Sequence, residues 1–236
     1  MREAGRTVAF AVRKAFEALE QGITTGELDS IVRRAIESEG ATPGFLGLYG
    51  FSATACISIN EEIVHGIPGD RVVQSGDLVT LDCGAIVDGY NSDYAVTQVA
   101  GPSTSEKDDL IDTTRASLEM GIRAARPGNR VGDISNAIES HVLPKSYELV
   151  REYVGHGIGK NLHEPPQIPN FGPAGHGLEL RAGLVLAIEP MVNVGGWKTR
   201  MLDDGWTIVT EDSTLSCHFE HTVAITEDGP VVLTVE

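Results

Sequence analysis

Cysteine is scarce in this chain of 236 residues, and Cys56, Cys83 and Cys217 form no C-x-x-C pair. An odd, scattered set is typical of reduced thiols in a cytoplasm and argues against a disulfide framework. Long apolar runs are also missing, because no stretch of about 18 hydrophobic residues occurs, so we expect no membrane span. The first residues, MREAGRTVAF, lack the apolar run and cleavage signature of a secretory signal. These absences together predict a cytoplasmic protein.

Basic residues are few as well. The chain has 18 Lys and Arg against 34 Asp and Glu, a formal net charge of −16. A nonspecific nucleic-acid binder is normally basic, so we expect no direct nucleic-acid partner. An acidic excess suits solubility, cationic substrates or metal ions, and most of the carboxylates are expected on a solvated surface. With 41% hydrophobic residues, the chain can form one large domain or two small ones.

Apolar residues at helical spacing predict four helices in two pairs. Thr24 and Glu27 have the spacing of a capping box at the start of the second helix, and Ser103 and Glu106 have it at the start of the third. Pro127-Gly128 separates the third helix from a fourth, which is expected to run to about residue 143. The periodic positions are Val8, Val12, Phe16 and Leu19; Leu28, Ile31, Val32, Ala35 and Ile36; Leu110, Ile111, Leu118 and Ile122; and Ile134 and Ile138.

The strand-like segments also occur twice. GDLVTLD (76–82) and GLVLAIE (183–189) each end in a carboxylate, and D-x-x-V at Asp93 and E-x-x-V at Glu220 are each followed by Gly-Pro. The two offsets, 189 − 82 = 107 and 220 − 93 = 127, indicate an insertion in the second half. Chance similarity is the alternative. If the duplication is real, two α+β halves face each other across a pseudo-twofold axis, and their equivalent carboxylates converge.

The segment 81–97, LDCGAIVDGYNSDYAVT, is predicted to form a hairpin. Asp88-Gly89 is a turn signal between two strand-like runs, which places Asp82 on one strand and Asp93 on the other. These carboxylates could simply be polar residues at strand ends. However, an unpaired carboxylate inside an apolar run would cost several kcal/mol, so it needs a cation or hydrogen-bond donors. Glu189 in LAIEPM and Glu220 in SCHFEHTVAI have the same requirement.

Four such carboxylates brought together would repel one another and raise each other's pKa values. Two divalent cations would balance their charge. The glycine-rich segment GHGIGKNLHEPP (155–166) adds His156 and His163, and carboxylates with one imidazole suit Mn, Fe, Co or Zn. Two metals bridged by carboxylates form a hydrolytic site. A calcium module would not explain the histidines, and the segment lacks the G-x-x-x-x-G-K-[ST] spacing of a phosphate loop.

At this point the chain resembles the methionine aminopeptidase family over nearly its whole length. The motifs that carry the resemblance are ISINEEIVHGIPGD, LDCGAIVDGYNSD, GHGIGKNLHEPP, AIEPM and FEHT. The resemblance implies an α+β pita-bread fold, in which two pseudo-symmetric halves, roughly 1–102 and 103–236, surround a curved antiparallel sheet within one catalytic domain. Only 25 residues separate His163 from Glu189 (189 − 163 − 1), as in the type I branch. One departure is the start of the chain, since most family members have a short segment before the position of MREAGR.

The resemblance also implies the roles of the residues that bind metal and act on the peptide. Asp93 and Glu220 correspond to bridging ligands of two divalent ions, His156 and Glu189 complete one ion, and Asp82 chelates the other. Glu189 is additionally the general base. His163 corresponds to the histidine that binds the scissile carbonyl, and His65 to one that contacts the amide on the leaving side. Asn60 and Ser216 match positions that hold a structural monovalent cation in some relatives.

The implied activity is removal of the initiator methionine from nascent proteins and peptides whose second residue is small. The expected partners are peptide and protein N-termini, with transient ribosome contact, and the expected state is a monomer. Relatives often have tyrosine where this chain has Leu48 or Phe51, so we expect a less polar pocket. The residues at the pocket positions are Leu48, Phe51, Cys56, Leu162 and Trp206.

Two other functions remain open for this sequence. A proline-specific peptidase of the same fold usually carries an additional N-terminal domain, for which this chain has no room. A pita-bread binding protein that has lost catalysis typically lacks metal ligands, and none is missing here. Assays with Met-Gly, Gly-Pro and Xaa-Pro peptides would separate the enzymes.

Overall fold

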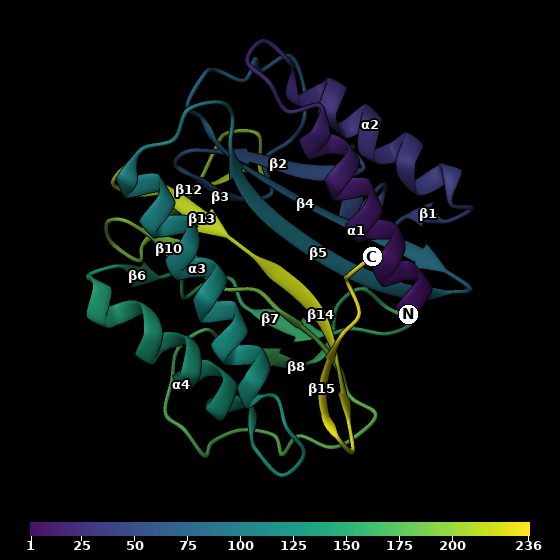
Figure 1. Ribbon diagram of the computed structural model, residues 1–236, viewed down its shortest axis with the longest axis vertical. Helices are drawn as coiled ribbons and strands as arrows, with labels where there is room; N and C mark the ends of the chain where they lie inside the picture. The colour runs from purple at the N-terminus through teal and green to yellow at the C-terminus, as the bar shows by residue number, and fades with distance from the viewer.

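Two pairs of consecutive helices and a curved antiparallel sheet make up most of the computed structural model, which describes residues 1–236. The helices are α1 (Arg2–Glu17), α2 (Thr25–Ser38), α3 (Ser105–Ala124) and α4 (Val131–Val142), with short 3₁₀ turns η1 (Leu48–Gly50) and η2 (Leu143–Lys145). In Figure 1, α1 and α2 lie to the upper right of the long strands β4 and β5, and α3 and α4 lie to the lower left, beside β14. None of the helices is both long enough and apolar enough to cross a membrane.

The helix boundaries agree with the sequence patterns, with one correction. The capping box of α2 is confirmed, since the Thr24 hydroxyl accepts the N–H of Glu27 and the Glu27 side chain accepts the N–H of Thr24. The capping box predicted from Ser103 is wrong. The cap of α3 is Thr104, whose hydroxyl accepts the N–H of Lys107. A helix that begins one residue later needs its acceptor one residue later, because the cap must reach the N–H three residues on.

The large sheet has nine strands. Its order is β1 (Thr42–Pro43), β4 (Leu78–Val87), β5 (Tyr90–Val99), β14 (Glu220–Thr226), β9 (Val185–Ile188), β7 (Gly155–Gly157) and β8 (Glu164–Ile168). In addition, β2 (Ala55–Ile59) pairs with β4, and β15 (Gly229–Val232) pairs with β14. Two three-stranded sheets complete the fold: β13 (Ser216–His218), β10 (Met191–Asn193) and β6 (Glu148–Leu149), and β11 (Thr199–Met201), β12 (Ile208–Thr210) and β3 (Glu62–Val64).

The predicted hairpin is confirmed as β4 and β5. Asp88 and Gly89 connect the strands with φ values of 51° and 76°, the left-handed conformations that a type I′ turn requires. In this register Asp82 lies opposite Ala95, and Asp93 lies opposite Gly84. The two carboxylates are therefore diagonal neighbours on adjacent strands.

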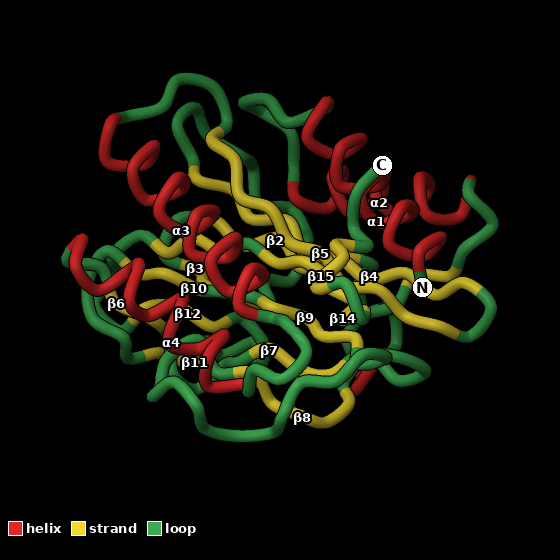
Figure 2. Tube along the Cα trace, turned by 60° about the horizontal axis from the view of Figure 1, so that its bottom comes forward, coloured by secondary structure: helices red, strands yellow, loops and turns green.

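Strand alternation decides which side chains meet the helices. On β4, Val79, Leu81, Cys83 and Ala85 pack into the hydrophobic cluster formed with α1 and α2, which leaves Asp82 on the opposite face. On β14, Val223 and Ile225 join the cluster formed with α3 and α4, which leaves Glu220 on the opposite face. Figure 2 shows the helices gathered on one side of the strands. Because successive side chains point to opposite faces, the helices cover one face and the carboxylates share the other.

The two halves contribute equivalent elements. In the first half α1 and α2 precede β2, β4 and β5, and β2 pairs with β4; in the second half α3 and α4 precede β7, β9 and β14, and β7 pairs with β9. The halves join where β5 meets β14, with Glu220 opposite Ala95 and His221 opposite Tyr94. The predicted duplication is therefore seen as matching supersecondary units. All three cysteines are buried, and none forms a disulfide.

Candidate metal centre

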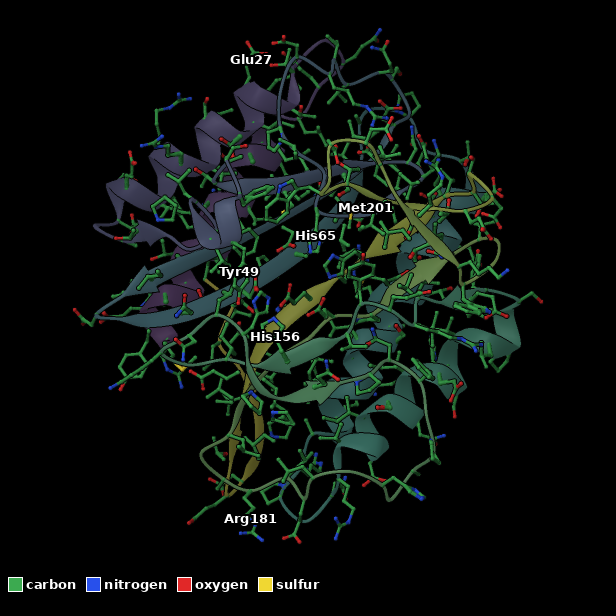
Figure 3. The ribbon with its side chains drawn as sticks, turned by 180° about the vertical axis from the view of Figure 1, so that it is seen from behind. Glu27, Tyr49, His65, His156, Arg181 and Met201 are labelled. Carbon is green, nitrogen blue, oxygen red and sulfur yellow. The ribbon has the colours of Figure 1, made fainter.

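A cavity of about 630 Å³ lies on the face of the sheet away from the helices. Figure 3 shows His65, Tyr49 and His156 gathered on this face. The cavity brings together every residue for which the sequence predicted a divalent-metal, catalytic or pocket role. These are Asp82, Asp93, His156, Glu189 and Glu220, then His65 and His163, and then Leu48, Phe51, Cys56, Leu162 and Trp206.

Four of the predicted ligands lie on strands β4, β5, β7 and β14, and the fifth, Glu189, directly follows β9. Candidate ligand atoms of Asp93, His156 and Glu220 all lie within 4.8 Å of one another. The Nε2 atom of His156 lies 3.8 Å from Oδ2 of Asp93 and 3.7 Å from Oε1 of Glu189. Asp82 faces the same cavity from β4, diagonal to Asp93. This set of four carboxylates and one imidazole has the composition expected for borderline-hard divalent ions.

Two features indicate that these carboxylates require a cation. Oδ1 of Asp82 and Oε1 of Glu220 are buried and have no hydrogen-bond partner. The cavity is lined by no lysine or arginine, so the protein itself supplies no balancing charge. A buried carboxylate without a partner costs several kcal/mol. The donor set therefore fits divalent metal ions.

Without a cation, the charges in the cavity alter one another's protonation. Burial raises the pKa of Asp93 to about 7 and, with help from the neighbouring Asp93, the pKa of Glu189 to about 8. Burial and the neighbouring carboxylates also raise the pKa values of Asp82 and Glu220 well above the ordinary range. Burial lowers the pKa of His156 to about 4. His156 is thus a neutral imidazole, the form that binds metal.

Glycines explain how His156 reaches the carboxylates. A Cβ atom on Gly155 would lie 2.3 Å from the Ala187 carbonyl oxygen, and one on Gly157 would lie 2.2 Å from the Pro165 carbonyl oxygen. Side chains at either position would therefore push β7 away from its neighbours. Nδ1 of His156 donates to the Gly157 carbonyl oxygen at 2.9 Å, which leaves the Nε2 lone pair directed at the carboxylates.

The other two predicted histidines stand beside this centre. The ring of His163 lies 4.4 Å from the ring of His156, centroid to centroid, at an interplanar angle of 69°. His65 has a left-handed backbone, with φ of 62°, and its ring meets Tyr153 edge to face at 5.6 Å. Burial lowers the pKa of His163 and lowers that of His65 to about 4. Both rings can therefore act as neutral hydrogen-bonding groups.

The predicted pocket residues form an apolar end to the cavity. Phe51, Cys56 and Leu162 belong to one buried cluster, against which Leu48 and Trp206 pack. The Phe51 and Trp206 rings meet edge to face, with centroids 5.1 Å apart. Phe45, which the sequence did not single out, belongs to the same cluster and also lines the cavity. This end can bury an apolar side chain next to the carboxylates.

The two residues predicted to hold a monovalent cation are also neighbours. The main-chain oxygen of Asn60 accepts the N–H of Ser216 at 2.9 Å. The Asn60 side chain donates to Asp77 at 2.9 Å and accepts the N–H of Leu78 at 2.9 Å. The hydroxyl oxygen of Ser216 is buried and unpaired. A cation at this place stays a prediction.

Besides Phe45, four further residues around the centre were not identified from the sequence. Thr222 binds the main chain of Asp93, Tyr49 and Tyr153 line the cavity, and Nε2 of His218 lies 3.9 Å from Oε2 of Glu189. His218 stands in SCHFEHT, two residues before Glu220, so its position was the signal available. No sequence pattern marks the other three, because each reaches the site through a fold-dependent contact.

Comparison with known proteins places this geometry in a family. The model described as metallopeptidase family M24 matches residues 1–227. A curated relative named methionine aminopeptidase 1, from Bacillus subtilis, is 48% identical over 234 residues, which cover 99% of this chain and 94% of the relative.

Solved structures agree with this placement. The crystal structure of methionine aminopeptidase from Thermotoga maritima superimposes with a TM-score of 0.98 at 42% identity, covering 100% of this chain and 95% of that one. The prolidase from Pyrococcus furiosus superimposes with a TM-score of 0.81 at 24% identity, and the match covers 100% of this chain and 62% of the prolidase. At that identity the prolidase shares the fold, which confirms the predicted pita-bread architecture.

Proposed function

The chain belongs to metallopeptidase family M24, and from this we infer that it is a metal-dependent methionine aminopeptidase. It hydrolyses the bond after the N-terminal methionine of peptides and proteins. The observation that carries this function is the cavity itself, in which a cluster of buried carboxylates, two of whose oxygens have no hydrogen-bond partner, lies beside an enclosed apolar end. The cluster suits hydrolysis, and the apolar end suits the side chain of a first residue.

The proposal assigns two divalent ions to the cluster. Asp93 and Glu220 would be shared between the ions, with His156 and Glu189 on one and Asp82 on the other. Bound divalent ions supply Lewis acidity and lower the pKa of water, so that a nucleophile forms at neutral pH. Cobalt, manganese, iron and zinc all suit this donor set. The Asn60 and Ser216 pair is proposed to help hold a monovalent cation with a structural role.

Three side chains have separate roles in hydrolysis of the peptide bond. Glu189 acts as the general base that takes the proton of the attacking water, and its position between the cluster and the cavity supports this role. His163 donates a hydrogen bond to the scissile carbonyl oxygen as negative charge develops there. His65, whose ring lies against Tyr153, contacts the amide on the leaving side. Both neutral imidazoles can donate without adding positive charge next to the peptide's amino terminus.

Methionine recognition is proposed for the apolar end. Phe51 and Trp206 meet edge to face and, with Cys56, Leu48 and Leu162, leave an apolar slot. Methionine is unbranched, and its polarizable sulfur packs well against aromatic rings. A small second residue is part of the proposal, because the chain must turn out of the cavity immediately after the first residue.

The remaining parts of the proposal concern domain organisation, compartment, oligomeric state and contact with ribosomes. We propose that residues 1–236 act as one catalytic domain, in the cytoplasm, as a monomer that meets nascent chains through transient contact with ribosomes. The three free cysteines suit a reducing compartment. Size-exclusion chromatography and cosedimentation with ribosomes would test the last two points.

A peptide panel on metal-stripped protein tests the activity. Met-Gly-Met-Met, Gly-Pro and Ala-Pro peptides would be offered to protein dialysed against chelator and then titrated with Mn²⁺, Co²⁺, Fe²⁺ or Zn²⁺. We expect cleavage of the methionyl peptide alone, and only after metal addition. Preferential cleavage of Ala-Pro would instead favour a proline-specific peptidase, and metal binding without cleavage of any peptide would favour a binding protein.

A further inference from the structure

Tyr49 stands at the mouth of the cavity and has no role in the function proposed above. It lines the cavity and is nevertheless 76% exposed. Its ring is stacked on that of His163, with centroids 6.0 Å apart and an interplanar angle of 17°. In Figure 3 the Tyr49 label lies beside those of His65 and His156, on the face that carries the cavity. A large aromatic side chain is thus presented to solvent next to the residue assigned to the scissile carbonyl.

The backbone shows that stability of the fold does not explain a tyrosine here. Tyr49 has φ 52° and ψ 17°, in the left-handed region, between Gly47 at φ 83° and Gly50 at φ 92°. Left-handed backbone costs a residue with a Cβ atom about 1–2 kcal/mol relative to glycine. An exposed ring recovers little of this through burial, and such outliers gather at functional sites.

The local turn aims this ring outward while its neighbours point inward. Gly47 N–H donates to the Phe51 carbonyl at 2.9 Å, which closes a short loop. Leu48 and Phe51, on either side of Tyr49, pack into the cluster at the enclosed end of the cavity. The loop therefore places two side chains around the first residue of a substrate and Tyr49 nearer the solvent.

An aminopeptidase encloses the N-terminus of its substrate, so the rest of the peptide must leave through the mouth of the cavity. The first segment to pass Tyr49 is the one that follows the scissile bond. We propose that Tyr49 is a specificity-determining residue, whose ring packs against the backbone of the second residue and the side chain of the third. This inference rests on the proposed function and adds to it a subsite for peptide beyond the scissile bond.

Substrate length provides the test. The quantity measured is the ratio of kcat/KM for Met-Gly-Met-Met to kcat/KM for Met-Gly, because only the tetrapeptide extends past the second residue. An aromatic contact of this kind corresponds to a factor of about two to ten. We expect Tyr49→Gly, which keeps the left-handed turn, to lower the ratio about fivefold, and Tyr49→Phe to preserve it. Tyr90→Ala is the matched control, since Tyr90 is also an exposed tyrosine, at 40%, and does not line the cavity.

Each outcome decides the matter. A lower ratio in Tyr49→Gly with an unchanged ratio in Tyr49→Phe and Tyr90→Ala supports the subsite. An unchanged ratio overturns it. This includes the case in which kcat/KM falls equally for both peptides because His163 has lost the support of the Tyr49 ring. If thermal unfolding shows that Tyr49→Gly is not folded, Tyr49→Asn, which tolerates the same φ, is read in the same way. Wild-type protein that cleaves neither peptide would refute the proposed function, and the subsite with it; wild-type cleavage with an unchanged ratio refutes the subsite alone.

Discussion

Thr222 and Asp93 exchange two hydrogen bonds across the junction of β14 and β5. The Asp93 N–H donates to the Thr222 hydroxyl oxygen at 2.8 Å, and that hydroxyl donates to the Asp93 carbonyl oxygen at 2.8 Å. Both residues are buried. The Thr222 side chain thus takes the place of a backbone hydrogen-bonding partner where the two halves meet. It fixes the main chain of Asp93, a predicted bridging ligand.

This relationship predicts a strong effect for a nearly isosteric change. Thr222→Val removes the hydroxyl and leaves the N–H and C=O of Asp93 buried without partners, which is expected to cost about 2–3 kcal/mol. Metal affinity should fall about tenfold to a hundredfold, as for other groups that orient a ligand. Chemical unfolding and metal titration would measure both. Thr114→Val, which removes a hydroxyl that donates to the Leu110 carbonyl within α3 and also bonds the Cys217 thiol, serves as the control and should change metal affinity little.

Metal-free protein should lose stability as pH rises. The pKa of Asp93 is raised from 3.8 to about 7, and that of Glu189 from 4.5 to about 8, chiefly by burial. Between the unfolded and folded pKa values the folded state holds more protons, so the free energy of unfolding decreases with pH. The Tm of chelated protein should therefore fall between about pH 6.5 and pH 8, because below about pH 6.5 the buried histidines, whose pKa values are lowered, change stability in the opposite direction. The stabilisation by added Mn²⁺ should grow over the same range, since protons compete with metal. A Tm of chelated protein that rises steadily with pH would contradict this.

The two histidines of GHGIGKNLHEPP should differ when replaced. His156→Ala should reduce metal content, because Nε2 of His156 is directed at Asp93 and Glu189. His163→Ala should retain metal and lower kcat by about 10²–10³, the scale of losing one donor to a developing oxyanion. Elemental analysis alongside peptide kinetics would separate the two effects. Equal metal loss in both variants would mean that the assignments are wrong.

Gly157 should tolerate no side chain. In Gly157→Ala the new Cβ atom would lie 2.2 Å from the Pro165 carbonyl oxygen, so β7 and β8 must separate and His156 must move. We expect lower stability and lower metal affinity together, measured by thermal unfolding with and without Mn²⁺. Gly69→Ala is the matched control, because a Cβ atom there meets nothing within 4 Å and its φ is not left-handed. Metal affinity that stays at the wild-type level in Gly157→Ala would contradict the close-approach argument.

The apolar end should select by shape rather than by sulfur chemistry. Norleucine, an all-carbon analogue of similar length, should be cleaved within about a hundredfold of methionine, since an apolar pocket separates near-isosteres by only about 1–3 kcal/mol. Leucine, branched at Cγ, should fall well below norleucine in the slot that includes Phe51 and Trp206. Alanine should bind weakly because it buries less, at about 0.8 kcal/mol per missing CH₂. The measurement is kcat/KM for Met-, norleucyl-, Leu- and Ala-Gly-Met-Met. If leucine matched norleucine, the slot model would be abandoned.

Strand periodicity made much of the site predictable. Asp82, Asp93, Glu189 and Glu220 each interrupt or end an apolar strand, and the alternation of side chains put all four on the face away from the helices. The cap at Thr104 escaped prediction because Ser103 and Glu106 have the same spacing as a true capping box. A local pattern could not choose between two registers that differ by one residue.

By itself the sequence determined the helix pairs, the hairpin at Asp88-Gly89 and the placement of the acidic side chains on one face of the sheet, since each of these depends on neighbours along the chain or on strand periodicity. Tertiary structure alone decided that Thr222 binds the main chain of Asp93, that His218 approaches Glu189, and that Tyr49 stacks on His163. The partners in these pairs are 129, 29 and 114 residues apart (222 − 93, 218 − 189 and 163 − 49). Contacts over such separations depend on sheet curvature and on how the two halves meet, and no short-range preference of the chain encodes them.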